Sequence, residues 1–192
     1  MAEQQDLTSL IKSTARQVFA AKGYASTTMK SVAAAAGVAP TVVKSLYANK
    51  EDLFVAAMRL PFEPSKAIPD LIAPGIEGLG DRLVEFMLKL MSDEQARNDI
   101  AELAATGSQF ANAGQTSALL EFLQNNVIDL IVSALGIPDA RLRGALITAE
   151  LGGIAAMRFV VRVEPLASID DREVVRLIGP RVQELLDPRR PL

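Results

Sequence analysis

The chain has 192 residues, a formal net charge of −3, and neither cysteine nor histidine. Without these two residue types a disulfide, a thiol nucleophile, an imidazole base and a His/Cys metal cluster are all excluded. We therefore expect no enzyme, no metal and no cofactor. The N-terminal residues MAEQQDL are neither basic nor apolar, so we expect no signal peptide and a soluble protein of the reducing cytoplasm.

The charge is divided unevenly along the chain. Residues 1–60 hold seven Lys/Arg and four Asp/Glu, a net charge of +3, whereas residues 61–192 hold thirteen and nineteen, a net charge of −6. A positive N-terminal segment can attract a polyanion such as nucleic acid, and the acidic remainder would repel it.

The first predicted element is a helix from about residue 6 to residue 22, in which apolar side chains recur every three or four positions. Gly23 should end this helix, because glycine readily takes the left-handed conformation found at helix C-termini. The apolar stripe comprises Leu7, Leu10, Ile11, Thr14, Ala15, Val18 and Phe19.

Two short helices joined by a glycine turn are predicted next. Thr27 or Thr28 can accept a hydrogen bond from a first-turn amide, so the second helix should begin there. Gly37 permits a sharp turn. Pro40 suits the first turn of a third helix ending near residue 46, because the amide that proline lacks would be unpaired at that position anyway.

Polar side chains on the third and fourth helices are expected to face outward. Thr41, Lys44 and Ser45 lie on the side of the third helix where base edges or phosphates would lie. Lys50 follows the predicted cap Asn49 in the first turn of a fourth helix ending near residue 60. A cation there opposes the helix dipole, so a phosphate partner explains it better than a local contact. Taken singly, each feature also fits an ordinary helical domain with solvated charges.

Together these helices resemble the N-terminal domain of the tetracycline-repressor (TetR) family of bacterial transcription regulators. The resemblance runs from about Leu7 to Met58 and rests on Phe19, Lys22-Gly23-Tyr24, Thr28, Val32-Ala33, Ala36-Gly37-Val38, Tyr47, Lys50-Glu51 and Leu53-Phe54. It implies that the third helix enters the major groove of DNA and that Lys50 approaches the DNA backbone. The DNA-binding residues expected on this basis are Thr28, Lys30, Ala39, Pro40, Thr41, Lys44, Ser45, Tyr47 and Lys50.

The third helix departs from the family pattern. The family usually has serine at the position of Ala39, a small residue at Thr41, threonine at Val42 and a phosphate-contacting tyrosine at Lys44. Lys44 can replace that tyrosine as a cation. The likeliest base contacts are then Thr41, Ser45 and the ring of Pro40 against a thymine methyl group.

The remainder of the chain also has a helical pattern, which predicts an all-α fold. Four prolines between residues 61 and 74 predict a hinge, and they divide a DNA-binding domain, residues 5–60, from an effector-binding and dimerisation domain, residues 61–192. Helices are predicted near residues 79–92, 93–106, 114–135, 138–163 and 170–187. The longest apolar run is interrupted by charged residues, so we expect no membrane span.

The helix near residues 140–163 is apolar on almost every side, so it should be buried on every side. In the family the last two helices of each subunit form a four-helix bundle with their mates. We prefer such a homodimer to a monomer core, because a two-fold operator needs a two-fold protein. The expected interface residues are Ala149, Gly153, Ala156, Val160, Val174, Ile178, Val182 and Leu185.

Apolar side chains of the larger domain could line a ligand cavity or simply fill a core, and the sequence does not separate these alternatives. The candidate pocket residues are Phe86, Met87, Leu90, Phe110, Phe122, Asn126, Glu150, Met157 and Arg158. Glu150 and Arg158 lie two helical turns apart on one face and either pair with groups across the dimer, the preferred structural interpretation, or fix the polar end of a ligand.

These patterns favour a ligand-responsive transcriptional regulator, a repressor released from a palindromic double-stranded DNA operator by an apolar small molecule. The main alternative is an all-helical carrier of an apolar ligand without sequence-specific DNA binding, which would leave the charge division unexplained. A nucleoid-type, sequence-blind DNA binder is a third hypothesis, although such a protein should be basic throughout.

Overall fold

The computed structural model describes residues 2–60, 62–92, 94, 97 and 118–192. This described part contains helices and turns and no strand, which confirms the predicted all-α fold. The described residues divide into two compact units, one of residues up to 63 together with 118–121, and one of residues 64–97 together with 122–192. The predicted helix near residues 93–106 and the start of the one near 114–135 lie outside the described residues.

Helix α1, Ala2–Ser26, begins earlier than predicted and is interrupted at Gly23, whose φ of 78° lies in the left-handed region. The residue expected to end the regular helix therefore does so. The ring of Phe19 packs edge-on against Phe54, with ring centres 4.8 Å apart, and Tyr24 packs edge-on against Phe54 at 5.0 Å. This aromatic cluster joins α1 to the fourth helix in the core of the first unit.

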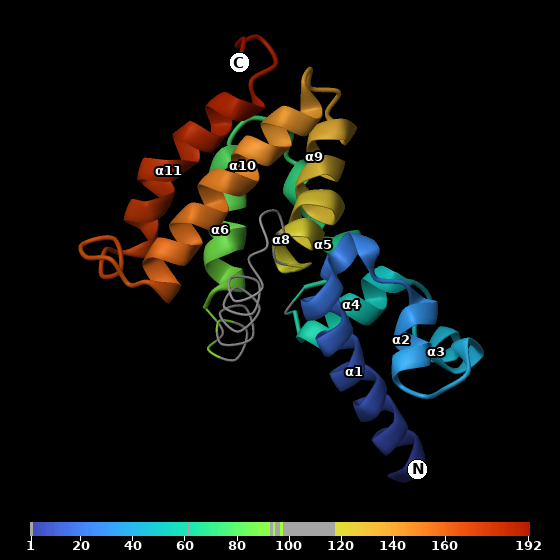
Figure 1. Cartoon of the computed structure of the whole chain (residues 1–192). Helices are drawn as coiled ribbons and strands as arrows, with labels where there is room; N and C mark the ends of the chain where they lie inside the picture. Colours follow the sequence, from blue (N-terminus) through green and yellow to red (C-terminus); the bar gives the residue numbers. More distant parts are fainter. Residues whose placement is uncertain (1, 61, 93, 95–96, 98–117) are drawn as a thin grey trace. The chain divides into compact units, whose positions relative to one another are not determined.

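The next three helices are α2, Met29–Ala35, α3, Pro40–Leu46, and α4, Lys50–Met58 (Figure 1). Thr28 and Ser31 form a reciprocal capping box at the start of α2, each side chain accepting a hydrogen bond from the other residue's amide. Asn49 caps α4 by accepting a 2.8 Å hydrogen bond from the Asp52 amide. The predicted helix-turn-helix layout is confirmed. Each helix boundary is set by residues close to it in sequence, which is why the sequence could predict it.

The proline-rich stretch predicted as a hinge contains helix α5, Pro64–Ile72. A helix can form here because both of its prolines occupy tolerable positions, and the hinge itself stays a prediction. Pro64 is the first residue, where no intrahelical amide bond is needed, and Pro69 costs one hydrogen bond inside the helix. Arg82 holds the following turn, donating 2.9 Å hydrogen bonds to the carbonyl oxygens of Leu71 and Glu77.

Helices α6, Leu79–Leu90, and α11, Asp171–Leu186, pack against each other in the second unit. They approach closely at Gly80, where an added Cβ atom would lie 2.3 Å from the carbonyl oxygen of Gly179. The side chain of Gln183 bridges the two helices, accepting from the Gly80 amide and donating to the Ile76 carbonyl, each at 2.9 Å. Substituting Gly80 would therefore force the two backbones apart, whereas a Cβ atom at Gly179 would first meet the side chain of Asp81.

Two further predicted helices contain π-helical segments. One runs as α8, Ala118–Leu123, η1, Gln124–Ile128, and α9, Asp129–Ala134, and the other as α10, Ala140–Ala155, and η2, Ala156–Val160. Helices α9 and α10 contact each other, and α10 also packs beside α11 (Figure 1). Within the described ranges, no helix has the length and apolar character needed to cross a bilayer.

Candidate nucleic-acid interface and subunit surface

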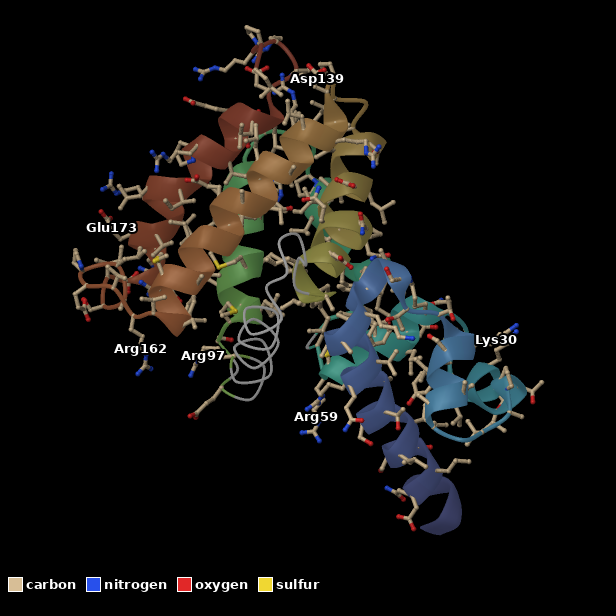
Figure 2. All side chains as sticks on the ribbon, viewed as in Figure 1. Lys30, Arg59, Arg97, Asp139, Arg162 and Glu173 are labelled. Carbon is tan, nitrogen blue, oxygen red and sulfur yellow. The ribbon has the colours of Figure 1, made fainter. Side chains whose placement is uncertain are left out.

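Helix α3 presents a row of exposed side chains on the first unit. Pro40, Thr41, Lys44 and Ser45 are all exposed, whereas Val43 on the opposite side of the helix is completely buried. Thr28, Lys30 and Ala39 are exposed as well, and Figure 2 shows the Lys30 side chain extending outward from α2. Most of the expected DNA-binding residues therefore lie on a surface where a ligand could reach them.

Lys50 is half-buried and holds the end of α1. Its Nζ atom donates hydrogen bonds to the carbonyl oxygens of Tyr24, at 2.9 Å, and Ala25, at 3.4 Å, and lies 4.2 Å from the centre of the Tyr24 ring. Burial lowers the pKa of Lys50, and the carboxylate of Glu121 opposes part of that shift. An ammonium group has three donors, and acceptors among the described residues use two of those of Lys50.

Tyr47, another expected DNA-binding residue, is only 8% exposed and lies in the core. Its hydroxyl group is buried and has no hydrogen-bond partner among the described residues. Burial also raises the pKa of this hydroxyl group. The structure thus places Tyr47 behind α3 and not in the exposed row.

Replacing Tyr47 with phenylalanine should raise the free energy of unfolding by about 1 kcal/mol, because the variant no longer buries an unpaired hydroxyl group. Thermal unfolding should show a midpoint higher by a few degrees, with unchanged affinity for DNA. A lower midpoint would contradict the unpaired state of this hydroxyl, and weaker DNA binding would return Tyr47 to the interface.

The sequence matches two family models. The model described as "Bacterial regulatory proteins, tetR family" matches residues 11–57, and that described as "Tetracyclin repressor-like, C-terminal domain" matches residues 77–186. The second match alone spans more than half of the chain. The chain belongs to the TetR family. It is a transcription regulator with a DNA-binding helix-turn-helix domain.

One solved structure supports this assignment, and a second similar structure is given with it. A TetR-family regulator from Streptomyces coelicolor A3 is 31% identical, with 94% of each chain covered and a TM-score of 0.55. NalD, the secondary repressor of the MexAB-OprM multidrug efflux pump in Pseudomonas aeruginosa, is 17% identical, with 93% of this chain and 97% of NalD covered and a TM-score of 0.43. The search of curated proteins found no match.

The described pocket candidates of this TetR-family chain differ in their exposure. Met87, Leu90 and Phe122 are buried, Phe86 is half-buried and Met157 is 46% exposed. The side-chain amide of Asn126 donates to the Phe122 carbonyl at 3.1 Å. Phe110 lies outside the described residues.

Glu150 and Arg158 take different partners within the second unit. The Glu150 carboxylate lies 3.5 Å from Arg181 of α11. The Arg158 guanidinium donates to the carbonyl oxygens of Leu166 and Ile169 and lies 2.8 Å from Asp171. Both side chains therefore make contacts within their own subunit, whereas pairs across the dimer were expected, and Arg158 holds the segment that leads into α11.

A groove of about 610 Å³ lies elsewhere in the second unit, and it contains none of the expected pocket residues. It runs between the start of α6 and the end of α11. Its lining includes Glu77, Glu184 and Arg190, so it is a charged surface and not an apolar cavity.

Helices α10 and η2 expose an apolar surface, although burial on every side was expected. Leu142, Leu146, Met157, Val160 and Val161 are each at least 40% exposed. Ala149 and Gly153 are exposed among them and Ala156 is half-buried. A Cβ atom added at Gly153 would meet nothing within 4 Å, so packing within the subunit does not require glycine there.

The expected α11 interface residues are placed differently. Val174 and Val182 are completely buried and Ile178 is nearly so, while Leu185 is half-buried. A side chain without exposed surface in its own subunit has no surface left to bury against a partner subunit. Helix α11 uses Val174, Ile178 and Val182 to pack on α6. The large apolar residue that α11 does expose is Leu177.

Arg143 is a structural residue that the sequence analysis missed. It is 1% exposed, and its Nε atom donates to the Pro138 carbonyl at 2.9 Å. Its Nη1 atom donates to Leu185 at 2.8 Å and Asp187 at 3.2 Å, and Nη2 donates to Arg190, in each case to the carbonyl oxygen. The sequence did contain a signal for this structural role, because an arginine within a strongly apolar helix needs buried hydrogen-bond partners.

Proposed function

We propose that this regulator is a homodimeric repressor that binds a near-palindromic operator in the cytoplasm and is released by an apolar small molecule. The observation that carries the DNA-binding part is the exposed row on α3, supported from behind by buried Val43. We further propose that the chain catalyses no reaction. The regulators it resembles act by binding, and its sequence lacks both histidine and cysteine.

In this proposal α3 lies in the major groove, and cations at its margins hold phosphates. Lys44 and Lys30 are exposed, so their ammonium groups can reach the DNA backbone without breaking a contact within the protein. Lys50 offers its remaining donor while its carbonyl contacts keep it in place. These residues set the position of α3 on the duplex, and the α3 side chains between them face the bases.

Replacing Lys44 with alanine should weaken binding to operator and random DNA alike and reduce the slope of log K against log salt by about one unit, because one phosphate contact is lost. Fluorescence anisotropy over a salt series measures this slope. Lys89→Ala is the matched control, because Lys89 is exposed on α6 in the other unit. An unchanged slope in the Lys44 variant would remove Lys44 from the phosphate contacts.

A gel-shift assay distinguishes the competing functions. The test compares DNA from upstream of the gene with random DNA of equal length. A repressor of the proposed kind prefers at least one upstream fragment, a nucleoid-type protein binds both equally, and a ligand carrier binds neither. The carrier alternative also leaves unexplained why positive charge is confined to residues 1–60.

Dimerisation through α10, η2 and α11 is supported by the exposed apolar residues of these elements. Leu146 and Val160 lie on the open side of α10 and η2, and Leu177 lies on the open side of α11. The contact between Glu150 and Arg181 joins the two helices within this surface. A second copy of the chain would remove the apolar side chains from water, and two-fold symmetry would place two α3 helices for two half-sites.

Release by a small molecule is supported by the apolar content of the second unit and by its two π-helical segments, which are frequent at functional sites. A ligand that takes the protein from almost fully bound to almost fully released must favour the released state by about 5.5 kcal/mol. Lipophilic compounds can be screened by thermal shift and then by operator release. If compounds that raise the unfolding temperature never displace DNA, the ligand-release part is wrong.

A further inference from the structure

We propose that α3 reads its half-site through thymine methyl groups and base amino groups, without bidentate recognition of guanine or adenine. This inference rests on the proposed operator binding and specifies the kind of operator. The evidence is the set of atoms that α3 and the preceding residue Ala39 expose to solvent.

The first observation is what this surface lacks. Guanine is most often read by arginine or lysine, and adenine by asparagine or glutamine, each through a pair of hydrogen bonds. Residues 39–48, from the cap of α3 through the turn after it, contain no arginine, asparagine, glutamine, aspartate or glutamate. Apart from Lys44, α3 therefore has no side chain that can make the usual paired contacts to guanine or adenine.

The second observation is the exposed carbon surface at the start of α3. Ala39, Pro40 and Thr41 are consecutive and all exposed, and they present a methyl group, a proline ring and a second methyl group. The C5-methyl group of thymine is the apolar feature of a base edge in the major groove. Contact between these surfaces removes both from water, so this end of α3 favours thymine.

The third observation concerns Ser45. Its hydroxyl group donates a 2.8 Å hydrogen bond to the Val42 carbonyl, which uses its only proton. The Ser45 oxygen can then only accept, and the base donors in the major groove are the amino groups of adenine and cytosine. Ser45 therefore favours adenine or cytosine over guanine or thymine as the base it faces on one strand, because the oxygen atoms of guanine and thymine at that edge are acceptors.

The test begins by selecting an operator from a pool of random duplexes with the full-length protein. Each thymine of the selected site is then replaced by deoxyuridine, which removes only the methyl group. At one or more half-site positions we expect about a fourfold loss of affinity, the value of one buried methyl-sized group. Thymines flanking the site serve as the control and should show no loss.

Two variants assign these effects to residues. Thr41→Ser keeps the hydroxyl group and removes the methyl group, so it should abolish the deoxyuridine effect at one thymine. Ser45→Ala should relax the preference for adenine or cytosine at one other base pair. Both residues are exposed, so circular dichroism should show unchanged folding.

Replacing guanine with 7-deazaguanine, which removes the N7 acceptor, should have little effect. A tenfold loss at one guanine that disappears in Lys44→Ala would overturn the inference, because Lys44 would then read guanine directly. A selected operator that tolerates deoxyuridine everywhere would overturn it too. If no sequence is enriched at all, the proposed operator binding itself fails, which is a separate outcome.

Discussion

Replacing Gly153 with arginine is expected to produce a monomer and to lower operator affinity at least about 100-fold, because one α3 helix cannot occupy two half-sites. The substitution places a long charged side chain among the exposed apolar residues of α10 and η2. Since a Cβ atom at this position meets nothing within 4 Å in the subunit, the fold of each subunit should survive. Light scattering at about 10 µM protein measures the mass, because dimerisation depends on concentration.

Two further variants make this result specific. Gly153→Ala adds only a methyl group and improves helix propensity, so it should remain dimeric. Ser133→Arg adds the same charge at an exposed position on α9 and should leave both mass and operator affinity unchanged. A dimeric Gly153→Arg protein with full operator affinity would place the subunit interface elsewhere.

Replacing Arg143 with methionine should lower the free energy of unfolding by about 3–5 kcal/mol. The guanidinium satisfies carbonyl oxygens of four residues, Pro138, Leu185, Asp187 and Arg190, and methionine would leave those that remain buried without a donor. Urea unfolding followed by circular dichroism measures the change.

Arg176→Met is the matched control for Arg143→Met. Arg176 is 68% exposed and pairs with Glu173 on the surface of α11, and an exposed pair of this kind adds little stability because water screens it. Arg143→Lys should lose most of the stability as well, because a single ammonium group cannot span the same carbonyl oxygens. Equal stability of the Arg143 and Arg176 variants would contradict the structural role of Arg143.

The helix-turn-helix domain could be predicted because its signals are local. Gly23, Thr28, Gly37 and Asn49 each act on a backbone only a few residues away, and the structure has the expected turn or cap at each of them. The proline-rich stretch shows the limit of such local signals, because residues 64–72 form helix α5 despite two prolines. A proline interrupts a helix only where its missing amide would have made an intrahelical hydrogen bond. Pro64 is the first residue of α5, where no such bond is made.

The second unit was less predictable, because its side-chain partners lie far away in sequence. The apolar stripe of α11 was recognised, but its periodicity does not say whether it packs on α6 or on another subunit. The same holds for Glu150, whose partner Arg181 lies on another helix. Lys50 combines both cases: its place in the first turn of α4 was predicted, whereas its hold on Tyr24 and Ala25 depends on the folded domain.

The way Arg143 binds the end of the chain has a consequence for how freely that end can vary. At residues 185, 187 and 190 the guanidinium contacts only main-chain oxygen atoms, which every amino acid supplies, proline included. The side chains at these three positions can therefore change during evolution without loss of the hydrogen bonds from Arg143. A fluorophore or affinity tag attached beyond Leu192 should leave the anchor intact for the same reason.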